Sequence, residues 1–394
     1  MPSSGDEQDR PPGGKKEKSR RPGNTAFRQQ RLKAWQPILT PKTVLPLFFA
    51  LGLILGPIGG LLLWASAQVQ EIVIDYTECS KATDVLQTIP DKFVSTAFKT
   101  ALTDRDAPKW ALTNTTAQNL VGQNITAEIC TLQFTLPSDL GPPVLFYYRL
   151  TNFYQNHRRY VKSLDEGQLS GTARTRSQLD GAGECSPLIA NEDGKPYYPC
   201  GLIANSMFND SFTSPVLLNV AGGSGSSNET YLMTTDGIAW TSDSKRYGKT
   251  KYTPDEVVPP PNWQKRYGVN YTVDTLPDLT NWGEFHVWMR TAGLPMFSKL
   301  ARRNDNDVMK AGTYQVNITH NFPVMEYAGT KSMVISTSTV MGGKNPFLGI
   351  AYIVVSGLCV LLGALFTARH LFQPRKLGDH TYLSWNNDAS PAAH

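Results

Sequence analysis

The sequence predicts a membrane protein in which two transmembrane helices flank a large, mainly antiparallel β ectodomain with short helices and long loops. Two observations concern the ends of the 394-residue chain: an apolar run covers residues 44–67, and a second uncharged run covers residues 345–368. The third is that apolar and polar residues alternate in several stretches between the two runs. We therefore expect five parts: a tail at 1–43, a helix at 44–68, an ectodomain at 69–344, a helix at 345–369 and a tail at 370–394.

The N-terminal tail has two sections of different composition. Residues 1–23 are rich in Pro, Gly and charged residues and have almost no apolar side chains to bury, so we expect them to be disordered. In residues 24–37, Asn24 or Thr25 is a suitable cap for a short helix that ends before Pro37. Apolar and basic side chains are interleaved there: Phe27, Arg28, Arg31, Leu32, Lys33 and Trp35. Such a juxtamembrane segment either lies on anionic cytosolic lipid or docks to a cytosolic partner, and its residues alone favour neither.

The first apolar run contains no charged residue between Lys42 and Glu71. About 20 residues at a rise of 1.5 Å cross the ~30 Å hydrocarbon core, so the run is long enough to span a membrane as a helix. A signal peptide has a shorter apolar core that lies nearer the N-terminus. Small residues recur at every fourth position of the run, namely Gly52, Gly56 and Gly60. In lipid, a face of small residues lets another helix approach closely.

The second run has small residues seven positions apart, at Gly349, Ser356 and Gly363, which places them on one face of a helix. Two interpretations of these faces remain open: the two helices pack on each other, or a partner's membrane helix packs on them. Neither run contains an acidic or basic residue of the kind that marks an ion or proton path. The pair therefore has the pattern of an anchor with faces suited to helix packing.

The orientation in the membrane follows from charge. The first 43 residues carry ten Lys and Arg against four acidic residues, and the positive-inside rule then places both tails in the cytosol. The N-glycosylation sequons all fall between the helices, at Asn114, Asn124, Asn209, Asn228, Asn270 and Asn317. Sequons and an even number of cysteines in this segment both indicate a lumenal or extracellular, glycosylated ectodomain. The positive net charge is explained by this topology, and we expect no nucleic-acid partner.

Period-two alternation predicts the strands of the ectodomain. In 129–136, the apolar residues occupy alternate positions, and the same holds for 314–322, where Asn317 falls on the polar side. Less regular strands are predicted at 71–76, 144–153 and 332–341. Residues 281–292 place aromatic residues at helical spacing, although their types also suit a strand.

The ectodomain contains four cysteines, Cys79, Cys130, Cys185 and Cys200, which permit three pairings. We expect the sequence-adjacent pairing, Cys79 with Cys130 and Cys185 with Cys200, because it closes two moderate loops without crossing. Each such bridge contributes ~2–4 kcal/mol to stability. Cys359 lies inside the second helix, where we expect it to serve in packing.

Catalytic and cofactor-binding patterns are weak in this chain. No two of the six histidines lie within four residues of each other and there is no Cys-x-x-Cys pair, so the spacing of a zinc site is missing. Asp305 and Asp307 resemble a cation-binding pair of some lumenal sugar transferases, and His157 begins a polar cluster that suits an anion. We expect no catalytic residue, cofactor or metal, with a lumenal membrane-anchored enzyme as an alternative.

Several longer segments are similar to one known family. They are NTAFRQQRLKAWQP (24–37), LTNFYQNHRRYV (150–161), YPCGLIANSMFND (198–210), VPPPNW (258–263), VWMRTAGLP (287–295), GTKS (329–332) and GDHTYL (378–383). Together they resemble the cell division control protein 50 family, whose members are accessory β-subunits of type IV P-type ATPases, the phospholipid flippases. These segments are most similar to those of fungal members, and the matches extend from the N-tail to the C-tail.

The resemblance implies a non-catalytic subunit that forms a complex, expected to be one-to-one, with the ATPase. Such subunits are needed for the ATPase to fold, leave the endoplasmic reticulum and flip phospholipid, here expected to be phosphatidylserine or phosphatidylethanolamine, towards the cytosolic leaflet. It also implies residence in the Golgi, trans-Golgi network, endosome or plasma membrane, and the disulfide pairing chosen above. The candidate partner contacts become Phe27, Arg28, Arg31, Trp35, Gly52, Gly56 and Gly60. A two-span ion-channel subunit is a further alternative, disfavoured by the lack of polar pore-lining positions.

Overall fold

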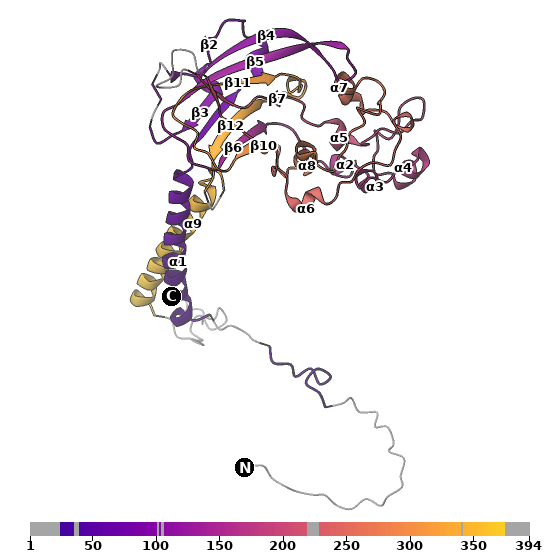
Figure 1. Ribbon diagram of the computed structural model, residues 1–394. Helices are drawn as coiled ribbons and strands as arrows, with labels where there is room; N and C mark the ends of the chain where they lie inside the picture. Colours follow the sequence, from indigo (N-terminus) through magenta and orange to yellow (C-terminus); the bar gives the residue numbers. More distant parts are fainter. Residues whose placement is uncertain are drawn as a thin grey trace, which may run out of the picture. The chain divides into compact units, whose positions relative to one another are not determined.

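The computed structural model describes residues 24–34, 39–100, 102–103, 106–218, 228–339 and 342–374 (Figure 1). The chain forms two compact units, which we describe separately. One comprises Met1–Gly56 and Val354–His394, and the other comprises Pro57–Ile353. Residues 1–23, expected to be disordered, and the segment 378–383 lie outside the described residues.

Two long helices, α1 (Pro41–Ala67) and α9 (Phe347–Phe372), are long and apolar enough to cross a membrane. They begin and end within a few residues of the predicted runs, and the residues at each start explain where the helix begins. Proline is favoured in the first turn of a helix because the missing N–H has no partner there, and α1 starts at Pro41. The Asn345 side chain accepts a hydrogen bond from the Phe347 backbone N–H at 3.1 Å and caps α9.

The strands of the second unit form two antiparallel sheets. The first sheet has the order β10-β6-β12-β1-β3, and the second has the order β2-β4-β5-β11-β8-β9 with β7 paired to β11. The strands of the first sheet are β1 (Glu71–Asp75), β3 (Val94–Ala97), β6 (Val144–Leu150), β10 (Phe297–Asn304) and β12 (Lys331–Thr337). Those of the second are β2 (Gln87–Thr88), β4 (Lys109–Gln118), β5 (Asn124–Leu136), β7 (Ser211–Phe212), β8 (Val216–Leu218), β9 (Glu229–Thr230) and β11 (Gly312–Thr319).

The predicted alternation of buried and exposed residues is confirmed in the long strands. In β5, Cys130, Leu132 and Phe134 are buried, and the polar residues between them are half-buried. One prediction fails in detail: β11 ends at Thr319, so Phe322 is in the core but comes from the loop that follows the strand. The strand predicted at 332–341 is β12, which begins one residue earlier and ends at Thr337.

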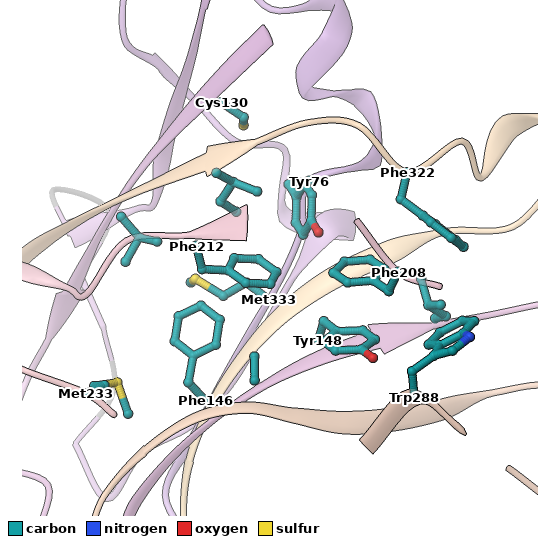
Figure 2. Packing of buried hydrophobic residues seen from close by; sticks show 14 of the residues in the cluster. Tyr76, Cys130, Phe146, Tyr148, Phe208, Phe212, Met233, Trp288, Phe322 and Met333 are labelled. Carbon is teal, nitrogen blue, oxygen red and sulfur yellow. The ribbon is translucent and has the colours of Figure 1, made fainter. Parts of the chain in front are cut away.

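Aromatic side chains from both sheets meet in one core (Figure 2). The rings of Tyr148 and Phe208 stack with centroids 3.9 Å apart, and Phe146 contacts Phe212 at 4.9 Å. Burying a large apolar side chain contributes ~1.5–3 kcal/mol, so this cluster is a main source of the ectodomain's stability. Because Phe208 and Phe212 flank the sequon at Asn209, the core fixes the position of that sequon.

Short helices occupy the connections of the second unit. They are α2 (Arg158–Val161), α3 (Glu166–Leu169), α4 (Arg176–Ala182), α5 (Leu202–Asn205), α6 (Thr241–Ser244), α7 (Gln264–Tyr267) and α8 (Gly283–Met289). The helical spacing noted at 281–292 corresponds to α8, in which Phe285 and Trp288 are buried. The Trp288 indole N–H donates to the Ile203 carbonyl at 2.7 Å, which ties α8 to α5.

Both expected disulfides are present. Cys79–Cys130 has its Cα atoms 6.1 Å apart and joins the segment after β1, in one sheet, to β5 in the other. Cys185–Cys200 has its Cα atoms 5.6 Å apart and closes the segment that lies between α4 and α5. The first bridge therefore fastens the segment that follows β1 to the second sheet, and the second stabilises a region with little sheet structure.

Candidate partner-binding surfaces

The N-terminal segment 24–34 forms a single turn in place of the predicted short helix. The Thr25 hydroxyl accepts a hydrogen bond from the Arg28 backbone N–H at 3.3 Å, as a helix cap would. The turn then ends at Gln30, whose φ of 53° lies in the left-handed region that interrupts a right-handed helix. The predicted helix is therefore wrong for the described part of this segment.

The predicted contact residues of this turn are exposed. Phe27 is 77% exposed and Arg28 is also on the surface, while the Arg31 guanidinium donates to the Asn24 side-chain oxygen. An exposed phenylalanine beside two arginines suits contact with anionic lipid and contact with a partner protein equally well. Trp35, the fourth predicted contact, lies outside the described residues.

In the first unit, the small residues of α1 pack against α9. The Ser356 hydroxyl donates to the Gly52 carbonyl at 2.7 Å, and a Cβ added to Gly52 would lie 2.6 Å from Val360 Cγ2. A Cβ on Gly56 would lie 3.0 Å from the Ser356 Oγ. Gly52 and Gly56 are therefore engaged within the chain, as the helix-on-helix interpretation expected.

In the second unit, the helix contact continues through Gly59 and not through Gly60. A Cβ on Gly59 would lie 2.8 Å from Ile353 Cγ1 and 3.0 Å from the Gly349 carbonyl, whereas a Cβ on Gly60 meets nothing within 4 Å. Each four-residue step advances about 40° around a helix, so the third of three such positions turns away from a neighbouring helix. A step of four residues followed by a step of three, from Gly52 to Gly56 to Gly59, stays on the face that contacts α9. Of the three glycines predicted to bind a partner, Gly60 alone is free of α9.

The sequons of the ectodomain occupy two environments. Asn114, Asn124, Asn209, Asn228 and Asn270 are all exposed. Asn317 lies in mid-strand on β11 and is half-buried, where its side-chain oxygen accepts from the Thr131 hydroxyl at 3.1 Å. That oxygen belongs to a polar ladder across β5 and β11, which marks the face of the second sheet opposite the core.

The residues that suggested an enzyme, Asp305, Asp307 and His157, are exposed at the surface. Asp305 forms a 2.8 Å ion pair with Arg303, and Asp307 accepts from the Asn304 side chain at 3.0 Å. His157 is exposed before α2. Within the described ranges, no three or more His, Cys, Asp and Glu side chains gather closely enough to hold a metal ion.

A buried ion pair organises the loops around Asn209. The Lys331 Nζ lies 2.7 Å from the Asp210 Oδ2, and both side chains are fully buried. Asp210 also accepts from the Tyr76 hydroxyl at 2.8 Å and from the backbone N–H of Phe322 at 2.6 Å. Burial lowers the pKa of Lys331, and the Asp210 carboxylate offsets part of that effect. Four separate chain segments therefore meet at one satisfied charge pair.

A second buried lysine caps a helix. The Lys299 Nζ donates to the carbonyls of Val287, Trp288 and Arg290 at 2.9, 2.7 and 2.7 Å, which lie at and just beyond the C-terminal end of α8. A cation is favoured there by the partial negative charge of the carbonyls at the C-terminal end of the helix. Burial lowers the pKa of Lys299 to about 7. The sequence predicted neither buried lysine, because Lys299 lies within β10 among polar residues and Lys331 begins β12, and both are positions where a lysine is ordinarily solvated.

An aromatic cavity of about 340 Å³ opens on the ectodomain surface, with Trp263, Trp282 and Arg266 among its lining residues. The two indole rings have centroids 5.4 Å apart, and the Arg266 guanidinium lies 5.7 Å from the Trp282 ring. Tryptophan and arginine in a concave site are typical of protein recognition surfaces. Trp263 ends the segment VPPPNW (258–263), whose sequence did not predict a place in a cavity.

Comparisons with known proteins all identify the same family. Residues 62–376 match the model of the LEM3 (ligand-effect modulator 3) family / CDC50 family. The chain is 44% identical over 379 residues to the phospholipid-transporting ATPase accessory subunit CRF1 of Saccharomyces cerevisiae, covering 95% of this chain and 91% of that protein. It is 42% identical to the accessory subunit CDC50 of Chaetomium thermophilum, covering 95% and 93%. Cell cycle control protein 50A of Bos taurus is 42% identical, with 90% of each chain covered.

Proposed function

This chain belongs to the LEM3/CDC50 family, and we propose from that premise that it is the non-catalytic accessory subunit of a phospholipid-transporting P-type ATPase. The observation that carries the proposal is its similarity, over 95% of its length, to proteins named as such subunits. The chain contains no Asp-Lys-Thr-Gly-Thr sequence to be phosphorylated, so the ATPase would supply the aspartyl phosphate. The subunit acts by binding and not by chemistry.

The finer parts of the proposal concern what the subunit contributes. It would assist the ATPase to fold, to leave the endoplasmic reticulum and to complete ATP-driven flipping of phosphatidylserine or phosphatidylethanolamine into the cytosolic leaflet. One subunit would pair with one ATPase chain, in the Golgi, trans-Golgi network, endosome or plasma membrane. An ectodomain rich in disulfides and sequons supports passage through the secretory pathway.

The proposed orientation places both tails in the cytosol and the ectodomain in the lumen. The ten basic residues of the first 43 support it, as do the five exposed sequons. In this orientation, the exposed turn that carries Phe27, Arg28 and Arg31 faces the cytosolic side of the ATPase. Gly60 then offers a small-residue position to an ATPase membrane helix on the lumenal side.

The test is affinity purification of the full chain from its own membranes in mild detergent, followed by incubation with labelled ATP. We expect a co-purifying protein of much larger size to form an acid-stable aspartyl phosphate. Recovery of the chain alone, as a symmetric oligomer without phosphoenzyme, would contradict the proposal.

A further inference from the structure

A pocket lies where α1 and α9 meet the first sheet, entirely within the second unit. Its volume is about 400 Å³, and its lining comes from three chain segments: Leu63, Ser66, Ala67 and Val69; Ala97, Phe98 and Lys99; and Lys344 and Pro346. The pairing of Glu71 with Ala97 brings the end of β3 beside the start of β1, and β1 follows α1 closely. The register of the sheet therefore delivers Lys99 to the end of a membrane helix.

The charge in this pocket has one sign. Lys99 and Lys344 are both exposed, and neither forms an ion pair with any residue that the structure describes. No acidic residue lines the pocket. Two lysine ammonium groups without a carboxylate favour an anion, and phosphate is a common ligand of lysine.

A buried hydroxyl adds a directional group to the same pocket. Ser66 is 7% exposed, and its Oγ accepts from the Asn345 backbone N–H at 3.0 Å. Among the described residues, this hydroxyl donates its own proton to no acceptor, so a ligand oxygen can receive it. The same hydrogen bond fixes the start of α9 against the end of α1.

The remaining wall is apolar, and two exposed aromatic residues lie at the same ends of α1 and α9. Leu63, Val69 and Phe98 line the pocket. Trp64, one position after Leu63, is 65% exposed, and Phe347, at the start of α9, is 74% exposed. Exposed aromatic residues at the ends of membrane helices are typical of the headgroup level of a bilayer.

We propose that this pocket binds a glycerophospholipid of the lumenal leaflet, with its phosphate between Lys99 and Lys344. The apolar wall and the two lysines together match a ligand that is anionic at one end and acyl at the other. A free phosphate would use the lysines but not the apolar wall. The inference rests on the two helices crossing the membrane and goes beyond the proposed function, because it gives the subunit a lipid contact of its own.

The test is native mass spectrometry of the full chain in mild detergent, titrated with dioleoylphosphatidylserine. Dioleoylglycerol, which has the same acyl chains and no phosphate, is the control lipid. We expect the variant K99Q/K344Q to bind phosphatidylserine about tenfold more weakly, which corresponds to about 1.4 kcal/mol. Lys109→Gln, an exposed lysine on β4 outside the pocket, should bind as the wild type does.

Two outcomes would overturn the lipid site. They are equal phosphatidylserine binding by the wild type and K99Q/K344Q, and equal binding of dioleoylglycerol and phosphatidylserine by the wild type. If the first is accompanied by loss of a co-purifying ATPase from K99Q/K344Q, the pocket is a protein interface. The proposed function fails separately, because it predicts co-purification with the wild-type chain whether or not the pocket binds lipid.

Discussion

At the scale of single residues, the buried pair of Lys331 and Asp210 is the feature with the largest local consequence. Desolvating two charges is costly, and the cost is offset here because each group has further hydrogen-bond partners. Removing one partner leaves the other charge buried without compensation. The pair therefore makes the positions of the surrounding loops depend on each other.

We expect Lys331→Met to lower the free energy of unfolding by about 3–5 kcal/mol, because the Asp210 carboxylate stays buried without its cation. Asp210→Asn, which keeps the sequon at Asn209, should destabilise similarly, and the double variant should cost less than the two single changes added together. Thermal unfolding of the purified full chain measures all three. Additive losses in the double variant would show that the two groups do not interact.

A second residue-scale prediction concerns His286, which is 2% exposed. Its Nε2–H donates to the Leu279 carbonyl at 2.6 Å, and its Nδ1 accepts from the Ser244 hydroxyl at 3.2 Å in the neutral form. Burial lowers the pKa of His286 below the usual 6.5, with partial offset by the Leu279 carbonyl and by Asp243. The unfolded chain then binds more protons than the folded chain below about pH 6.5.

Stability is therefore expected to fall as the pH drops from 6.5 towards the lower pKa of the folded state. His286→Phe should reduce the steepness of that fall while lowering stability at neutral pH through its lost hydrogen bonds. Melting temperatures measured between pH 7.5 and 5 give both quantities, with the exposed His157→Gln as control. Part of the dependence should remain, because burial and the nearby Lys331 also lower the pKa of His320. An unchanged slope in His286→Phe would rule out this histidine as a source of the dependence.

At the scale of elements, two adjacent glycines of α1 lie on different faces of the helix. Gly59 faces α9, and Gly60 faces away from it. This separates substitutions that disturb the chain itself from substitutions that disturb only a partner. Neighbouring positions of the same residue type thereby provide a matched pair of variants.

We expect Gly59→Leu to destabilise the chain, because its Cβ alone would approach Ile353 Cγ1 to 2.8 Å. Gly60→Leu should leave the melting temperature of the chain nearly unchanged and reduce co-purification of the ATPase, with Gly60→Ala intermediate. The measurements are thermal unfolding of the full chain and the ratio of ATPase to subunit after purification. Full recovery of the ATPase with Gly60→Leu would show that this face does not contact it.

The sequence predicted elements better than the contacts between them. Alternation in β5 and the apolar runs of α1 and α9 have clear periods, so their existence and faces follow from local pattern. The seam between the helices depends on a three-residue step that equal spacing of glycines did not reveal. The partner of Lys331, Asp210, comes from a distant segment, and a lysine at the first position of an apolar strand is ordinarily expected to be solvated. Trp263 became a cavity residue only through the fold of α7 and its neighbours.

At the scale of the whole molecule, the proposed topology predicts which parts are accessible from each side of the membrane. Intact microsomes should protect the ectodomain from added protease and leave an epitope on the N-tail open to digestion. Removal of N-glycans by an amidase should reduce the mass of the chain, with attachment mapped to exposed asparagines such as Asn114 and Asn270. A protected N-tail, or a glycan on a sequon engineered into it, would reverse the orientation.

The pairing of β1 with β12 also sets the timing of folding during synthesis. Gln70 donates to Thr337 across 267 residues, so the first strand of the ectodomain finds its central neighbour only when nearly the whole domain has been made. At about 5–20 residues per second, β1 waits for roughly 13–50 s with an unpaired edge. The subunit itself should therefore depend on lumenal chaperones before it can assist any other protein, and truncation before Lys331 should leave a retained, unfolded chain.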